Sequence, residues 1–150
     1  MQARVPDVTR IVGLALPSRP RAIAVFGLAL FFEVLMMVAR SLSGWHPTPL
    51  NSEPVMLFLD ALIAAALVEL SLRGALQGAL PYFGIGAALS LGVPAALEYF
   101  GGYTTGEVLW EAAFGVGFVF ARAASGSIYP CIALRFVQYL MIPAFAAVHR

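Results

Sequence analysis

Seven ionisable side chains interrupt the long apolar stretches of this 150-residue chain, and these are the residues with a capacity for chemistry. They are Glu33, Asp60, Glu69, Arg73, Glu98, Glu111 and Arg135. A charged side chain inside a lipid bilayer is costly, so each one indicates a function or a partner. A carboxylate can act as a general acid or base, whereas a guanidinium keeps its charge and has to be paired.

Two pairings follow from the types and spacing of these groups. Glu69 and Arg73 are four residues apart with the acid first, which is the favourable order for an ion pair on one helix face. Arg135 lies inside an apolar segment and needs a carboxylate from another segment. We expect Glu98 to form an intramembrane ion pair with Arg135, and Glu69 and Glu111 are the alternative partners.

The composition places these groups in a membrane. Hydrophobic residues make up 61% of the chain and charged residues 11%, and the mean hydropathy is +0.87. A soluble domain carries about 25% charged residues, so this surface is unsuited to water. The net charge of +1, with no lysine, gives no electrostatic footprint for nucleic acid. The single cysteine, Cys131, excludes an intrachain disulfide and reads as a small buried hydrophobe.

Five segments approach the length that a helix needs to cross a bilayer, about 20 apolar residues. They cover residues 22–40, 54–72, 82–100, 107–124 and 128–147. We therefore predict an all-α fold, a single transmembrane domain over residues 1–150 formed by a polytopic bundle of about five helices. Residues 1–21 form a cytoplasmic or interfacial segment, in which residues 5–16 are expected to lie on the membrane as a short helix.

The distribution of arginines sets the expected orientation. In a five-span topology, the N-terminal side of the membrane carries six arginines, namely Arg4, Arg10, Arg19, Arg21, Arg73 and Arg122. Only Arg40 and Arg150 fall on the other side. We expect a multi-pass protein of a bacterial-type cytoplasmic (inner) membrane, with its N-terminus in the cytoplasm.

Small residues recur at four-residue spacing within the predicted spans. The pairs are Gly84 and Ala88, Gly86 and Ser90, and Ala113 and Gly117. In lipid, where packing drives helix association, small residues at this spacing let backbones approach closely. We expect close helix contacts at these positions.

The segment around Glu69 and Arg73 is also part of a longer pattern. It reads Val68-Glu69-Leu70-Ser71-Leu72-Arg73-Gly74, and a glycine-rich helix with the turn Ser125-Gly126-Ser127-Ile128-Tyr129-Pro130 follows later. From about Ala66 to Ile142 the chain resembles the CPBP (Abi, type II CAAX protease-like) family of intramembrane proteases. The motifs of that family are Glu-Glu-x-x-x-Arg, Phe-x-x-x-His, and His-x-x-x-Asn or Asp. The resemblance implies a CPBP-like core over residues 66–142.

The departures from the family pattern all fall on its chemistry. Val68 stands in the place of the first, catalytic glutamate, and Pro94 and Glu98 stand where Phe and His would be. Arg135 and Tyr139 take the His and Asn positions of the third motif. The vestigial motif positions are Glu69, Arg73, Glu98, Arg135 and Tyr139. Valine cannot take a proton, and arginine neither binds a metal nor acts as a base, so the resemblance implies a degenerate member.

Histidines are also missing from the predicted spans. The two that occur, His46 and His149, lie in a loop and at the chain end. Without imidazole, a site made of carboxylates suits a soft transition metal poorly. We therefore predict no metal site and no cofactor.

These observations favour a non-catalytic scaffold or accessory subunit of a larger membrane complex. Its partners would be the lipid bilayer and other membrane-protein subunits. The expected docking face includes Phe31, Phe32, Met36 and Met37, together with the aromatic residues of the fourth span.

Two alternatives remain open. One is a divergent intramembrane protease or hydrolase that uses Glu69, Glu98 or Glu111. The other is a pigment-binding, ligand-binding or transport subunit in which Glu33, Asp60 and Glu98 line a path.

Overall fold

The structure is a computed structural model that describes residues 13–14, 16–44, 54–79 and 83–148 of the chain. The interfacial helix predicted over residues 5–16 lies almost wholly outside the described residues. His46 and His149, the two histidines of the chain, also lie outside them.

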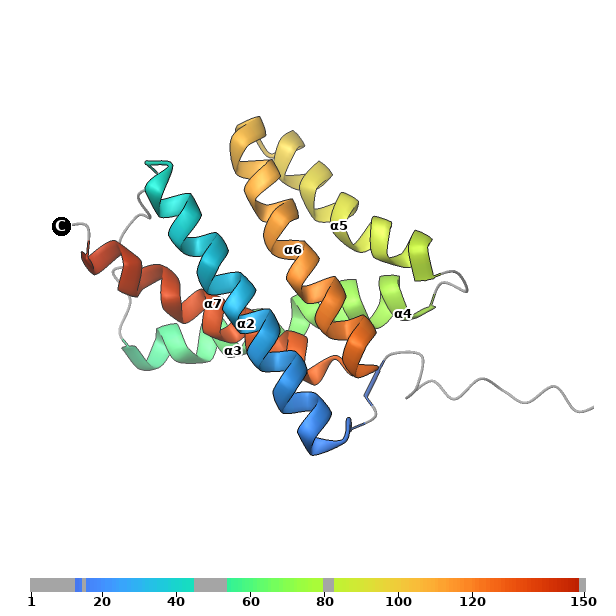
Figure 1. The fold of residues 1–150 in the computed structure, drawn as a ribbon. Coiled ribbons are helices and arrows are strands. Elements are labelled where there is room, and N and C mark those ends of the chain that lie inside the picture. The colour runs from blue at the N-terminus through green and yellow to red at the C-terminus, as the bar shows by residue number, and fades with distance from the viewer. Residues whose placement is uncertain (1–12, 15, 45–53, 80–82, 149–150) are drawn as a thin grey trace, which may run out of the picture.

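The described residues form helices joined by short turns, and no strand occurs among them (Figure 1). In chain order the elements are α2 (Arg19–Leu42), α3 (Pro54–Glu69), η1 (Leu70–Leu76), α4 (Gln77–Ala79), α5 (Phe83–Phe100), α6 (Thr105–Ser125) and α7 (Tyr129–Val148). The elements α3, η1 and α4 follow one another without a break, so the π-helical η1 lies within one longer helix. The predicted all-α fold is confirmed.

Three stretches of these helices are long and apolar enough to cross a membrane. They are Pro20–Leu42, Val55–Leu76 and Thr105–Ser125. Two further apolar helices within the described part of the chain, Gly84–Phe100 and Tyr129–Ile142, are shorter. By length and composition, the chain is therefore a membrane protein with transmembrane helices, three of them of full spanning length.

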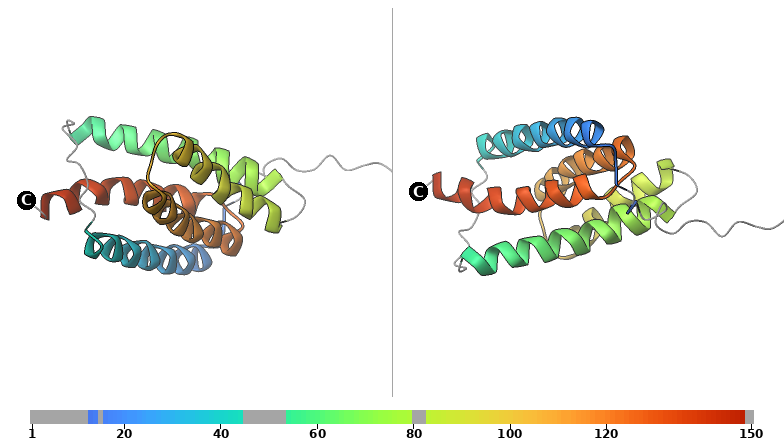
Figure 2. Two further views of the ribbon diagram at one scale, coloured as in Figure 1. Left: turned by 90° about the horizontal axis from the view of Figure 1, so that it is seen from above. Right: turned by 90° about the horizontal axis from the view of Figure 1, so that it is seen from below.

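The helices pack in an order that differs from their order in the chain. The helix α6 packs against both α2 and α5, and α3 packs against α7. Both views in Figure 2 show α2 and α3 on opposite sides of the bundle with α7 between them. The consecutive helices α2 and α3 are thus separated in space, and their interior side chains meet residues from distant parts of the chain.

The ends of α6 are defined by local hydrogen bonds. At its start, the Thr104 hydroxyl accepts from the backbone N–H of Glu107 at 3.3 Å, and the Glu107 carboxylate accepts from the backbone N–H of Thr104 at 2.8 Å. This reciprocal capping box satisfies two backbone donors that the first turn would leave free. At its end, Gly126 adopts the left-handed conformation with φ of 70°, which a glycine adopts without steric cost. The turn into α7 follows directly.

Small residues do create close approaches, but not at every predicted position. A Cβ on Gly86 would lie 2.9 Å from the carbonyl oxygen of Gln77, and a Cβ on Gly117 would lie 2.5 Å from Oε1 of Glu33. A Cβ on Gly84 would meet nothing within 4 Å. The predicted close contact is therefore confirmed at Gly86 and Gly117 and is wrong at Gly84, which lies at an exposed position near the start of α5.

The interior combines an apolar cluster with buried charge. The cluster consists of Val25, Ala29, Phe118, Ala121, Cys131 and Leu134. The thiol of Cys131 donates to the carbonyl oxygen of Phe118 at 3.3 Å, which fits the predicted buried cysteine. Glu33, Glu69 and Arg73 are also buried. The large exposed side chains, in contrast, are mostly apolar, which is the distribution that lipid requires.

The glycine contact at α5 is testable by single methyl additions. Gly86→Ala should destabilise the detergent-solubilised protein by about 1–3 kcal/mol, because the new methyl meets the backbone of Gln77. Gly84→Ala is the matched control on the same helix, where open space and a gain in helix propensity favour an unchanged or slightly higher stability. Unfolding in mixed micelles, followed by circular dichroism, measures the difference. Equal stability changes in the two variants would contradict this packing.

Candidate functional site

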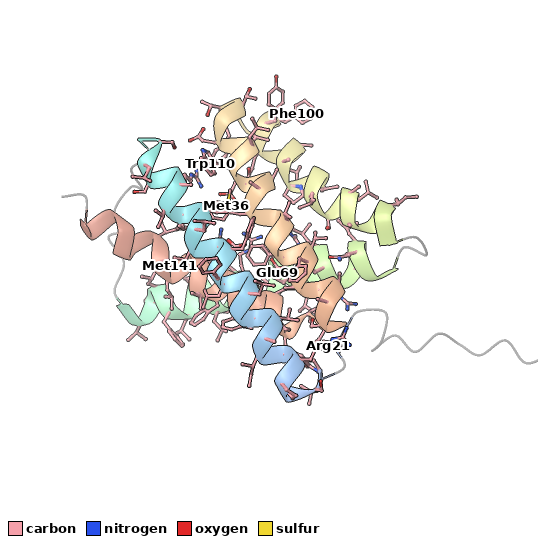
Figure 3. The ribbon with its side chains drawn as sticks, viewed as in Figure 1. Arg21, Met36, Glu69, Phe100, Trp110 and Met141 are labelled. Carbon is pink, nitrogen blue, oxygen red and sulfur yellow. The ribbon has the colours of Figure 1, made fainter. Side chains whose placement is uncertain are left out.

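Glu69 is the central charged residue of the bundle, as Figure 3 shows, and its side chain is 0% exposed. Its Oε1 accepts a hydrogen bond from Nε of Arg135 at 3.1 Å. Its Oε2 lies 3.7 Å from Nε of Arg73, an ion pair that is too long for a hydrogen bond. This is the i, i+4 contact that the spacing of Glu69 and Arg73 predicts. One carboxylate therefore compensates two guanidinium groups.

The π-helical segment η1 carries Arg73, whose side chain is 1% exposed. Nη1 donates to the carbonyl oxygen of Ser90 at 3.4 Å, and Nη2 donates to the carbonyl oxygen of Gly115 at 3.2 Å. The Ser90 carbonyl is available because the residue four positions later, Pro94, has no N–H to donate to it within α5. Arg73 thus connects η1 to α5 and α6 through backbone acceptors.

Arg135 on α7 occupies the other side of the same cluster. Its Nη1 donates to Oε1 of Gln138 at 2.8 Å. Its Cζ lies 4.1 Å from the centroid of the Phe118 ring, and Cζ of Arg73 lies 5.5 Å from that centroid. Both guanidiniums therefore lie within cation–π distance of one buried aromatic ring.

The partner of Arg135 differs from the one that we expected. Among the described residues, Arg135 forms its ion pair with Glu69 and not with Glu98. The reason is the packing order, since α3 packs directly against α7, whereas Glu98 lies in the last turn of α5. Glu98 is half-buried, and its Oε2 has no hydrogen-bond partner.

A second ion pair connects α2 to α6. Nη1 of Arg40 lies 3.1 Å from Oε1 of Glu111, and the Arg40 side chain is largely buried. Glu111, the other alternative partner for Arg135, is therefore engaged by Arg40. Because Arg40 lies near the end of α2 and Glu111 near the start of α6, the pair fixes these two helices in an antiparallel arrangement.

A cavity of about 640 Å³ lies between the end of α3, η1, α5, α6 and α7, beside the end of α2. It extends from Tyr103, next to the start of α6, to Arg73 and Ser90 in the interior. Its charged lining consists of Arg40, Arg73, Glu98, Glu107, Glu111 and Arg135. Apolar residues supply much of the remaining wall.

Positions that the protease resemblance assigns to its motifs come together at this cavity. The cavity is lined by Val68, Arg73, Pro94, Glu98, Arg135 and Tyr139. Glu69 does not line it, because the carboxylate lies buried behind the wall against Arg73 and Arg135. At the position where the resemblance would place a catalytic glutamate, the cavity wall presents the side chain of Val68.

The remaining acidic groups do not extend the site. Glu33 is 1% exposed with no hydrogen-bond partner for either oxygen, whereas Asp60 is exposed on α3. Of Glu33, Asp60 and Glu98, only Glu98 borders the cavity, so these three do not line a common path. Within the described part of the chain, no three His, Cys, Asp or Glu side chains gather closely enough to hold a metal ion.

Several polar residues at the cavity were not identified as site residues from the sequence, among them Arg40, Ser90 and Gln138. The sequence could have indicated Gln138 and Ser90, since Gln138 follows Arg135 by one helical turn and Ser90 precedes Pro94 by four residues. It gave no indication of Arg40, because a position at the end of a span is typical of a loop arginine.

No family model, curated protein or solved structure matches the chain. The function therefore has to be inferred from the residues and from their arrangement around the cavity.

The central ion pair is testable by a double-mutant cycle. Glu69→Gln and Arg135→Met should show a coupling energy of about 1–3 kcal/mol in unfolding from mixed micelles, because each change leaves the other charge buried. A cycle of Glu98→Gln with Arg135→Met is the control. Its effects should add to within about 0.5 kcal/mol, since these two side chains form no ion pair. A larger coupling for Glu98 than for Glu69 would reject the described pairing.

Proposed function

We propose that this protein is a non-catalytic integral membrane protein with a CPBP-like core, which acts as a scaffold or accessory subunit of a larger membrane complex. The observation that carries the proposal is Val68 in the cavity wall, where the resemblance would require the catalytic glutamate. An aliphatic side chain cannot take a proton from water, so the position has no general base.

The neighbouring acid does not compensate for this loss. Glu69 is fully buried, does not line the cavity, and is engaged by Arg135 at 3.1 Å and Arg73 at 3.7 Å. Arg135 itself takes the place of a histidine and offers neither a metal ligand nor a base. These charged residues join η1 and α3 to α7, which favours a structural role for the motif positions.

The outer face of α2 supports a docking role. Five large apolar residues at alternating spacings of three and four form a stripe, which we call the α2 stripe, of Leu28, Phe31, Leu35, Val38 and Leu42. This spacing is the one by which two helices interlock side chains along their length. Phe31, one of the expected docking residues, is 67% exposed, whereas Met37 was wrongly included because it is 1% exposed and packs inside. The proposed partner is a transmembrane helix of another subunit.

The proposed location is a bacterial-type cytoplasmic membrane with the N-terminus in the cytoplasm. Arg19 and Arg21 at the start of α2 and Arg122 at the end of α6 support this orientation by the positive-inside rule. Arg73 does not support this orientation, because its side chain is buried in the bundle and does not lie in a loop.

A divergent hydrolase is the second candidate function, and one observation favours it. Glu98 and Glu111 both line a cavity of about 640 Å³, which is large enough to hold water and part of a substrate. Glu111 is paired with Arg40, so Glu98 is the acid that such chemistry would use.

The two functions make opposite predictions for peptide hydrolysis. The purified protein in lipid vesicles should cleave neither prenylated peptides nor transmembrane peptides above the rate without protein, because no base stands at Val68. Glu98→Ala and Glu69→Ala should give the same product level as the unmodified chain. A reproducible hydrolysis that Glu98→Ala abolishes would replace the scaffold by the hydrolase.

The docking role is testable on the α2 stripe. The tagged chain, solubilised in mild detergent, should migrate as a complex with a fixed stoichiometry to a second membrane protein. Phe31→Ala with Leu35→Ala should dissociate that complex, because these exposed side chains would form the seam. The matched control is Leu62→Ala with Ile63→Ala, two exposed apolar residues on α3. A monomeric chain, or equal loss in the two double variants, would contradict docking through α2.

A further inference from the structure

The inner part of the cavity has an excess of positive charge. Arg73 and Arg135 both line the cavity, and they share the single carboxylate of Glu69 behind its wall. Arg73 is 1% exposed, and its only ion pair among the described residues is the 3.7 Å contact with Glu69, beside hydrogen bonds to the carbonyl oxygens of Ser90 and Gly115. A buried charge that is only partly compensated is costly in an interior of low dielectric constant. The inner end of the cavity therefore favours a group that carries negative charge.

A negative charge without an ion-pair partner in the described part of the chain, that of Glu98, lies in another part of the cavity. Glu98 lines the cavity, has no cation within ion-pair distance among the described residues, and has an unpartnered buried oxygen. Arg40 forms its ion pair with Glu111 at 3.1 Å and not with Glu98. Glu98 thus favours a group that carries N–H or O–H donors and positive charge.

Arg73 and Arg135 form the positive end of the cavity and Glu98 forms the negative end. The other charged groups of the lining are engaged within the protein, since Arg40 pairs with Glu111 and the Glu107 carboxylate accepts from the backbone N–H and the hydroxyl of Thr104. A ligand of one charge would satisfy only one of the two ends, whereas a zwitterion satisfies both.

The outer end of the cavity lies where a membrane surface would be. Tyr103 lines it and is exposed, and Tyr99 and Phe100 are exposed at the end of α5 nearby. Figure 3 shows Phe100 at the opposite end of the bundle from Arg21. Exposed aromatic residues at a helix end are typical of the headgroup level of a bilayer. The apolar part of the wall, which includes Leu72 and Leu91, offers space for the start of a hydrocarbon chain.

We propose that this cavity binds a zwitterionic amphiphile with a primary ammonium group, the chemistry of an ethanolamine phospholipid headgroup. The ammonium donates to Glu98, and the phosphate accepts from Arg73 and Arg135. This ligand would connect Glu98 to Arg135, the two residues that the protein itself leaves unbonded to each other. This binding depends only on the cavity and its charges, so it is independent of the proposed scaffold role.

The test uses the full chain in nonionic maltoside micelles, with thermal unfolding followed by circular dichroism. Lysophosphatidylethanolamine should raise the melting temperature more than equal concentrations of lysophosphatidylcholine or lysophosphatidylglycerol. The choline headgroup lacks N–H donors, and the glycerol headgroup lacks the positive charge. Glu98→Gln should weaken the apparent affinity for the ethanolamine lipid by about tenfold, because the amide keeps an acceptor oxygen but loses the negative charge that faces the ammonium. Asp60→Asn removes an exposed carboxylate on α3 and should leave the affinity unchanged.

Soluble phosphoethanolamine distinguishes the two sources of this chemistry. If it reproduces the stabilisation, the cavity binds a soluble zwitterion; if only the lysolipid does, the ligand is a lipid. Equal shifts for the three lysolipids in the unmodified chain would overturn the proposal, and so would an ethanolamine preference that Glu98→Gln leaves intact. The comparison of lysolipids needs no variant, so it decides the question even if Glu98→Gln fails to fold.

Discussion

The arrangement of the bundle depends on one buried carboxylate that lies between two guanidinium groups. Glu69 on α3 meets Arg135 from α7 and Arg73 from η1, and Arg73 in turn reaches the backbones of α5 and α6. Charges that are buried this deeply are poor sources of net stability, because each one loses its hydration. They instead favour one arrangement of the helices over all others, since any sliding of one helix against another would leave a charge without its partner.

The backbone contributes to this cluster through an uncommon route. In most helices a carbonyl is already occupied by the N–H four residues later, so it has limited capacity for a side chain. Pro94 removes that donor in α5 and leaves the Ser90 carbonyl to Arg73. In α6 the carbonyl oxygen of Gly115 accepts from Nη2 of Arg73, and a Cβ on this glycine would lie 2.5 Å from Cδ2 of Leu91. Pro94, a residue that weakens an isolated helix, thus supplies an acceptor that a buried cation requires.

Hydropathy and local spacing were sufficient for part of this structure. The apolar runs locate the helices, and the four-residue spacing of Glu69 and Arg73 identifies their contact. The partner of Arg135 was not accessible in this way, because Glu69, Glu98 and Glu111 are equivalent until the packing of α3 against α7 is known. The burial of Met37 and Arg73 likewise depends on how each helix is rotated in the bundle, and an apolar sequence with little periodicity leaves that rotation undetermined.

The π-helical geometry of η1 makes chain length as important here as residue identity. Hydrogen bonds from each residue to the fifth one along accommodate one residue more than an α-helix would. Deleting a residue of this segment that precedes Arg73 would let the chain return to α-helical pitch, so the flanking helices would keep nearly the same directions. Glu69 and Arg73 would then be three residues apart and not four. The wide turn thus accommodates an extra residue without redirecting the chain, and the length of η1 is matched to the contact between Glu69 and Arg73.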